Sequence, residues 1–267
     1  MMRITWETMK ERKWPVVIYS VVSLLLLILY IALFPSLQSQ SQQLAEVLKT
    51  MPESLLKALG SSAAQMSNFT LEALLASKQF SILFQALAAV LAISIAANDI
   101  AAEIETGTIE FLLSQPISRI KLYFARFFSG SLLLIIFCIL STITVIPMAK
   151  LFHVDYSAIV YWRLLFVAIL YSLAIYSFSY MLSAIFSAKG RVSGIAGGIV
   201  ALMYVIFIIS SLKESLDKLK YLSFFHYFSA DVLYTGIDKL GVWIFIAVII
   251  ICTATGAIIF DRRDIAT

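Results

Sequence analysis

Six long apolar stretches dominate the 267-residue sequence and decide what it can fold into. Each is long enough for a helix that crosses the bilayer, which needs roughly 20 apolar residues. The stretches cover residues 15–37, 80–98, 127–149, 162–188, 192–212 and 240–260, and Arg163, near one end of the fourth, is the charged residue among them. Barrel strands would alternate apolar and polar residues, whereas these runs are continuously apolar. We therefore predict six transmembrane helices.

The composition excludes a soluble globular protein. Hydrophobic residues make up 61% of the chain and charged residues 13%, whereas soluble domains carry about 25% charged residues. We predict an all-α integral membrane protein in which residues 1–267 form one transmembrane domain. The first apolar run is longer than the core of a signal peptide and lacks a small-residue cleavage pattern after it, so we expect it to remain as a span.

The basic residues predict that both termini are cytoplasmic. Cytoplasmic flanks of membrane helices are enriched in Lys and Arg. With the N-terminus inside, the cytoplasmic segments hold Arg3, Lys10, Arg12, Lys13, Arg119, Lys121, Arg126, Lys189, Arg191, Arg262 and Arg263. The net charge of +4 then reflects membrane orientation, and we expect no binding of nucleic acid.

Three segments outside the spans have amphipathic or aromatic character. Residues 1–14 predict a helix in the headgroup plane, because Trp6 and Trp14 favour the interface, although a solvated basic tail that only sets topology is an alternative. The loop 38–79 predicts short amphipathic helices folded over the outer surface. The aromatic segment 213–239 predicts a piece partly sunk into the outer interface.

The sequence offers no convincing metal or catalytic cluster. His226 lies among aromatic residues, and His153 and Asp155 form an isolated pair, so neither histidine has further ligands at metal-binding spacing. Cys138 and Cys252 both fall inside predicted spans, without a redox or metal motif.

The inner loop between the second and third spans, residues 98–127, has an unusual pattern. The acidic residues Asp99, Glu103 and Glu105 come first, followed by Gly107, and the fourth acidic residue, Glu110, stands within an apolar group at helical spacing, Ile109, Leu112 and Leu113. Pro116 interrupts the helix, and Ser118 can cap the next one. The pattern predicts a short helix that presents acidic and apolar side chains to the cytoplasm.

This loop resembles that of the membrane permease subunits of ABC-2 type transporters. The residues that carry the resemblance form an E-x-G-T-x-E-x-L-L-S-x-P-I-S-R run from Glu105 to Arg119. Six spans, a basic N-terminal segment and an aromatic segment before the sixth span also resemble that family, so the similarity covers essentially the whole chain. It implies an N-terminal elbow helix and a cytoplasmic coupling helix that docks on an ATP-binding subunit.

The resemblance also implies which residues couple and which partners are needed. The coupling residues are Glu103, Glu105, Gly107, Thr108, Glu110, Leu112, Leu113, Pro116 and Arg119. The sequence has no G-x-x-x-x-G-K-[ST] motif, so ATP and magnesium belong to another polypeptide and this chain is neither an ATPase nor a cofactor carrier. The family assembles two ATP-binding subunits with two permeases, here identical or homologous, among the lipids of a prokaryotic plasma membrane. A structural loop without a partner is the alternative.

Two further patterns concern helix contacts. Gly190, Gly194 and Gly198 recur every four residues, which indicates a close helix contact within the chain or between two permeases, the former being favoured. One stripe of the fourth span carries Ser172, Tyr176, Ser179 and Ser183. Such a stripe can face a transport pathway, but hydrogen bonding to neighbouring helices and to its own backbone is the favoured interpretation.

The function these patterns predict is that of an ATP-driven exporter. No charged residue lies in the middle of a span, which disfavours an ion relay and suits an amphipathic or lipid-like cargo. Two alternatives remain. An intramembrane lipid-modifying enzyme would need an acid and histidine cluster or a D-x-x-D spacing, and a signalling or assembly subunit would bind an ATPase without transport.

Overall fold

The computed structural model describes residues 9, 12–49, 70–109, 118–212, 214–228 and 236–263, with the backbone alone for 41–49, 211–212 and 214–215. Every regular element in these ranges is a helix. In chain order they are α2 (Lys13–Lys49), α5 (Leu71–Leu75), the π-helix η1 (Ala76–Leu83), α6 (Phe84–Asp99), α7 (Ala101–Glu105), α9 (Arg119–Thr142), α10 (Val145–Leu151), α11 (Ala158–Ile185), α12 (Lys189–Leu212), the 3-10 helix η2 (Glu214–Leu222), α13 (Phe224–Tyr227) and α15 (Lys239–Arg262).

Six helical stretches are long and apolar enough to cross a membrane, as predicted. They are Lys13–Gln40, Leu71–Asp99, Arg119–Leu151, Ala158–Ile185, Lys189–Ser210 and Lys239–Arg262. The second begins earlier than predicted because polar residues interrupt the apolar run while the helix continues through them. Its start is set by Thr70, whose side chain accepts a hydrogen bond from the amide of Ala73 at 3.2 Å.

The third span also differs from the straight helix predicted over 127–149. It begins at Arg119, where Ser118 caps it as predicted by accepting a hydrogen bond from the amide of Lys121 at 3.4 Å. α9 ends at Thr142, and after a turn at 143–144 the chain continues as the separate helix α10. The apolar run continues across this turn, so hydropathy alone does not locate it.

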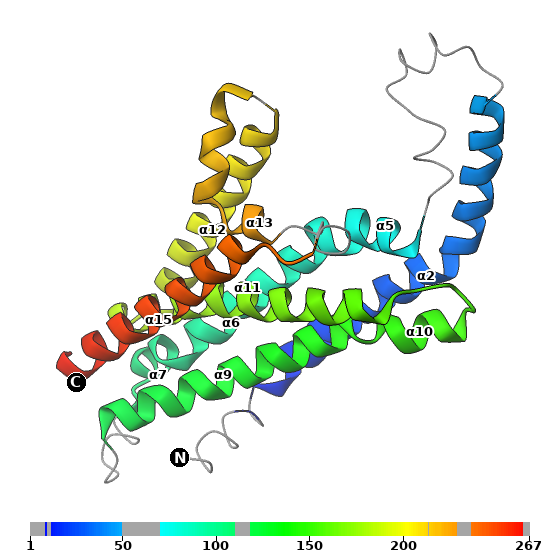
Figure 1. The fold of residues 1–267 in the computed structure, drawn as a ribbon. Coiled ribbons are helices and arrows are strands. Elements are labelled where there is room, and N and C mark those ends of the chain that lie inside the picture. The colour runs from blue at the N-terminus through cyan, green and yellow to red at the C-terminus, as the bar shows by residue number, and fades with distance from the viewer. Residues whose placement is uncertain are drawn as a thin grey trace.

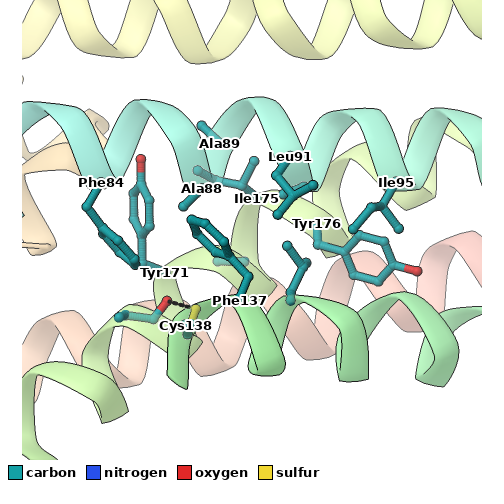
Figure 2. Close-up of a cluster of buried hydrophobic side chains, with 14 of the residues drawn as sticks. Phe84, Ala88, Ala89, Leu91, Ile95, Phe137, Cys138, Tyr171, Ile175 and Tyr176 are labelled. Carbon is teal, nitrogen blue, oxygen red and sulfur yellow. Dashed lines mark hydrogen bonds between the residues drawn. The ribbon is translucent and has the colours of Figure 1, made fainter. Parts of the chain in front are cut away.

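α11 is the central helix of the bundle and packs against α6, α9, α12 and α15. Its tyrosines are fully buried, and Figure 2 shows Tyr171 and Tyr176 among the side chains of α6 and α9. Phe84 of α6 and Phe137 of α9 stack there with ring centroids 5.8 Å apart. In lipid, where apolar surface gains little from burial, such close packing is what holds helices together.

The second span is tied to the first by a buried amide. Gln79 lies in η1 and is fully buried, and its Nε2 donates to Oγ of Ser23 in α2 at 3.2 Å. A π-helix adds a residue to a helical turn. Gln79 thereby meets α2 in the part of the second span that lies nearer to α5.

The segment between α12 and α15 folds back into the bundle. η2 packs along α12, and α13 then places Phe225 and Phe228 inside the protein. Phe228 stacks on Phe84 at 5.7 Å between centroids, and its carbonyl accepts a hydrogen bond from Nε2 of Gln85 at 3.1 Å. The aromatic residues predicted to sink into the interface are therefore partly used as core.

Different helices and helix ends lie at the two ends of the bundle. One end, which we name the α7 end, holds α7, the starts of α2 and α9, the α11–α12 junction and the end of α15 (Figure 1). The opposite end holds α5, α10 and the later turns of α2. α12 slants away from the other long helices. Most of the predicted elbow helix (1–14), apart from residues 9 and 12–14, and most of the loop helices predicted within 38–79 lie outside the described residues, although α2 itself continues to Lys49.

Candidate coupling site

The predicted coupling segment begins at a break between α6 and α7. The break lies at Ile100, and a side chain of the neighbouring helix α11 stabilises it. Oγ of Ser183 accepts hydrogen bonds from the amides of Ile100 and Ala101, at 3.3 and 2.9 Å. Ser183 is fully buried, so these amides are satisfied where water does not reach them. The direction of α7 is therefore fixed by α11.

α7 is short and ends at Thr106, where the glycine of the E-x-G-T motif allows the chain to turn. Gly107 has φ +72°, a conformation that favours glycine. Its amide bonds the carbonyl of Ile104 at 3.2 Å, and the Thr108 hydroxyl bonds the carbonyl of Glu103 at 3.3 Å. Gly107 and Thr108 thus stabilise the end of α7, which explains both residues in structural terms.

Four charged side chains from four segments form a cluster at the α7 end. We name Arg12, Asp99, Glu103 and Arg126 the charge cluster. Arg12 pairs with Asp99 and lies 3.4 Å from Oε1 of Glu103, and Nη2 of Arg126 lies 2.5 Å from the same oxygen. All four side chains are at least 85% covered.

A tyrosine of α11 contacts the charge cluster. Tyr176 of α11 donates a hydrogen bond to Oδ2 of Asp99 at 2.7 Å. Burial lowers the pKa of the Arg12 guanidinium, the positive charge of Arg126 lowers it further, and Glu103 acts in the opposite direction. Charges buried in this way persist because each has a partner of opposite sign.

Glu105, the first residue of the motif, is bound to the start of α12. Its Oε2 accepts a hydrogen bond from the amide of Lys189 at 2.8 Å. A carboxylate at a helix N-terminus satisfies one of the free amides there and is attracted by the helix dipole. α7 therefore contacts the fifth span through Glu105, and through Glu103 it contacts Arg12, just before the first span, and Arg126 of the third span.

Two arginines at the α7 end connect the start of α9, the end of α11 and the end of α15. Arg119, at the start of α9, donates from Nη1 to the carbonyl of Arg263 at 2.5 Å. Arg263 in turn donates to the carbonyl of Ala184 at 2.8 Å and to Oγ of Ser187. The end of the sixth span is thus tied to the start of the third and to the end of the fourth.

Some predicted site residues can be placed and others cannot. Glu103, Glu105, Gly107, Thr108 and Arg119 lie together at the α7 end. Four predicted coupling residues, Glu110, Leu112, Leu113 and Pro116, lie outside the described residues. Among the residues that are described, no three His, Cys, Asp or Glu side chains gather as metal ligands.

The polar stripe of α11 is occupied by hydrogen bonds within the protein. Ser172, Tyr176, Ser179 and Ser183 are all fully buried. Ser172 and Ser179 donate to backbone carbonyls one turn earlier, at 2.8 Å in both cases, while Tyr176 and Ser183 bond α6 and the α6–α7 break. This supports the packing interpretation of the stripe.

The glycine stripe of α12 has no close neighbour among the described residues. Gly190, Gly194 and Gly198 are exposed, and a Cβ atom added to any of them would meet no described atom within 4 Å. The intrachain contact that the sequence favoured is therefore not formed with any described residue at these positions. The reason is the slant of α12 away from its neighbours (Figure 1). A contact between two permeases stays a prediction.

Sequence reasoning missed the pairing inside the charge cluster. Arg12 and Arg126 were interpreted as residues that set topology, and Asp99 as an exposed acid. The only signal was that Asp99 and Glu103 stand four residues apart and so share a helix face. Their partners are distant in sequence, with Arg12 and Glu103 separated by 91 positions.

Comparison with known proteins supports the resemblance of the inner loop. Residues 7–265 match the model of a family described as ABC-2 family transporter protein. The search of curated proteins gives no match. The family match covers all six spans and the whole α7 end. The chain therefore belongs to the ABC-2 family of transporter membrane proteins.

Proposed function

We propose that this permease is half of the membrane pathway of an ATP-driven exporter and that its α7 end docks on a separate ATP-binding subunit. The observation that carries this proposal is the bonding of α7. Glu103 and Glu105, on one short helix, contact the start of the first span, the third span and the start of the fifth. Membership of the ABC-2 family supports the assignment.

The bonding gives a route by which movement of the partner reaches the spans. A displacement of α7 acts on α9 through Arg126, on α12 through Lys189 and on α11 through Ser183. Separating a buried ion pair is costly, so these helices move with α7 as a body rather than leaving it. Such rigid-body movement is how spans change between inward-facing and outward-facing arrangements.

The docking surface we propose extends from Glu103 to Arg119. Glu105 and Thr108 are exposed and can contact the partner, while Glu103 and Gly107 act by positioning α7. Glu110, Leu112, Leu113 and Pro116 complete the surface on the strength of the family motif. In this assignment the α7 end and both termini are cytoplasmic, and the partners are two ATP-binding subunits and a second permease in a prokaryotic plasma membrane.

The cargo we propose is amphipathic or lipid-like. The charged side chains of the described spans lie near span ends, and the buried polar groups between them are neutral amides and hydroxyls such as Gln79 and Gln85. An ion that crossed such an interior would find no charged side chain to pair with. An amphipathic or lipid-like molecule, which is mostly apolar, does not need such a partner.

Charge reversal on the docking surface tests the coupling. The double variant Glu105→Lys with Glu110→Lys should no longer co-purify with the ATP-binding subunit and should lose ATP-driven transport. The two new lysines would repel a basic surface of the partner, and the hydrogen bond from the amide of Lys189 would be lost. Asp217→Lys, at an exposed acid of η2, is the matched control and should keep both. If the double variant co-purified and transported normally, the coupling assignment would be wrong.

The same purification separates the alternatives. A stoichiometric ATP-binding subunit with vanadate-sensitive hydrolysis, together with flux into vesicles, supports the exporter. An ATPase partner without flux of any cargo favours a signalling or assembly subunit. A chain that reproducibly lacks an ATPase partner after crosslinking in the cell favours the intramembrane enzyme.

A further inference from the structure

The opposite end of the bundle contains a cavity of about 560 Å³ between three parts of the chain. Its walls come from the later turns of α2, from the start of α5 and from the connection between α10 and α11, which lie near one another in Figure 1. The volume lies within the range of about 300–1,000 Å³ that is typical of small-molecule sites. The coupling site at the α7 end makes no use of this cavity.

The lining of the cavity combines carboxylates with aromatic rings. Glu72 and Asp155 supply two negative charges, Phe34, Phe152 and Tyr156 supply the rings, and no Lys or Arg is among the described lining residues. Phe34 is buried and forms part of the floor, whereas Asp155 is exposed at the rim. Carboxylates attract a cation, and aromatic faces attract it further while contacting an apolar body.

The walls are held in place by bonds that do not use up the carboxylates. Glu72 accepts one hydrogen bond at Oε1, from the amide of Ser157 at 3.0 Å, which joins α5 to the start of α11. A carboxylate offers about four acceptor positions on its two oxygens, so this bond, counted among the described residues, occupies a small part of its capacity.

The rim is shaped by a defined turn at the end of α10. The amides of His153 and Val154 bond the carbonyls of Lys150 and Ala149, at 3.2 and 3.0 Å, which is the pattern of a Schellman motif. His153 stands at its left-handed position with φ 53°, where glycine would be less strained. The turn carries Phe152, His153 and Asp155 into the lining of one cavity. The pair that looked isolated in the sequence thus acquires Glu72 and the aromatic rings as neighbours.

We propose that this cavity binds an amphipathic organic cation, in which a positively charged centre carries an apolar body. Glu72 and Asp155 hold the charge, and Phe34, Phe152 and Tyr156 contact the body. With the α7 end cytoplasmic, as proposed above, the site faces outward. Binding itself depends on neither ATP nor the partner subunit, so the site can be tested separately from export.

The test uses two probes of the same shape and opposite charge on the full chain. The chain is placed in phosphatidylcholine nanodiscs, and binding of tetraphenylphosphonium and tetraphenylborate is measured by equilibrium dialysis, with empty nanodiscs subtracted. We expect saturable binding of the phosphonium cation and none of the borate anion. Equal binding of the two ions, or no saturable cation binding, would overturn the proposal.

Substitutions in the lining locate the binding. Glu72→Gln keeps an acceptor for Ser157 and Asp155→Asn changes an exposed side chain, so both variants should fold. Each should weaken cation binding about fivefold, which corresponds to about 1 kcal/mol at a partly exposed site. Phe152→Ala should weaken it to a similar extent through lost aromatic contact.

A matched control separates this cavity from general surface charge. Asp217→Asn removes an exposed acid of η2, outside the cavity lining, and should leave cation binding unchanged. If Asp217→Asn weakened binding as much as Asp155→Asn, or if both lining variants bound normally, the site would be refuted. Cation binding by the chain in nanodiscs, together with reproducible failure to co-purify an ATP-binding subunit from cells, would refute the proposed export function and leave the site standing. An active ATPase complex whose permease binds no cation would refute the site and leave the export function standing.

Discussion

The contribution of each side chain of the charge cluster to stability depends on the presence of the others. Arg12, Asp99, Glu103 and Arg126 are largely covered by protein, and Tyr176 adds a hydrogen bond to Asp99. Removing one partner of a buried ion pair costs about 3–5 kcal/mol because the other charge is left unpaired, whereas removing both can be nearly neutral. The cluster therefore acts as a unit.

A double-mutant cycle on the pair of Arg126 and Glu103 measures this dependence. We expect Arg126→Met and Glu103→Gln each to lower the melting temperature of the purified protein by several degrees. The free energy of unfolding that the double variant loses should be about 1–3 kcal/mol smaller than the sum of the two single losses, because neither residue of the pair leaves the other as an unpaired charge. Strict additivity, measured by thermal unfolding in detergent, would show that the two residues do not interact.

Two glycines offer a matched comparison of packing at single positions. A Cβ atom on Gly130 would lie 2.2 Å from the hydroxyl of Tyr176, whereas one on Gly194 would meet no described atom within 4 Å. Gly130→Ala should therefore displace Tyr176 from Asp99 and destabilise the protein by about 1–3 kcal/mol, and Gly194→Ala should be neutral. Equal melting temperatures for the two variants would contradict the packing described here.

At the scale of elements, the break between α6 and α7 is the most consequential feature. It occurs inside a helical run that has no proline or glycine, and the amides that it frees are taken by Ser183 of another helix. The position of the predicted coupling segment thus depends on the contact of Ser183 with this break as well as on its own residues.

Substitution of Ser183 tests this arrangement. Ser183→Ala leaves two buried amides without their acceptor, at a cost of about 1–3 kcal/mol. We expect faster hydrogen exchange at residues 100–109 while exchange in the middle of α11 stays unchanged. Ser179→Ala is the control, since the Ser179 hydroxyl bonds only the carbonyl of Ile175 among the contacts described. Unchanged exchange at 100–109 would show that Ser183 does not hold the break.

The elements differ in how far the sequence could predict them. Hydropathy located all six spans, and the start of α9 followed from the Ser118 cap. The turn after Thr142 and the π-helix η1 lie in runs without a local signal, so only packing against other helices places them. The charge cluster also has no local signal, because an ion pair between distant segments depends on the fold. The cavity has none either, because Glu72 and Asp155 come to line it only when α5 and the connection before α11 lie side by side.

For the whole molecule, the two ends of the bundle have opposite chemical character. The α7 end gathers arginines and the bonded acids of α6 and α7, while the opposite end holds the cavity with Glu72 and Asp155. The family match covers both ends and all six spans.

Cysteine labelling tests the orientation of the bundle. In a background with Cys138 and Cys252 replaced by alanine, Asp155→Cys and Lys189→Cys place single thiols at opposite ends, both at exposed positions. An impermeant maleimide should label Asp155→Cys on intact cells, and should label Lys189→Cys only after the membrane is opened. The reverse pattern would invert the topology and place the cavity inside the cell.

The balanced composition of the charge cluster has an electrical consequence. Two guanidinium groups and two carboxylates sum to zero, so displacing the cluster along the membrane normal moves no net charge through the field. One uncompensated elementary charge would couple to the membrane potential by about 2.3 kcal/mol per 100 mV. A movement of the charge cluster along the membrane normal therefore neither gains energy from the membrane voltage nor works against it.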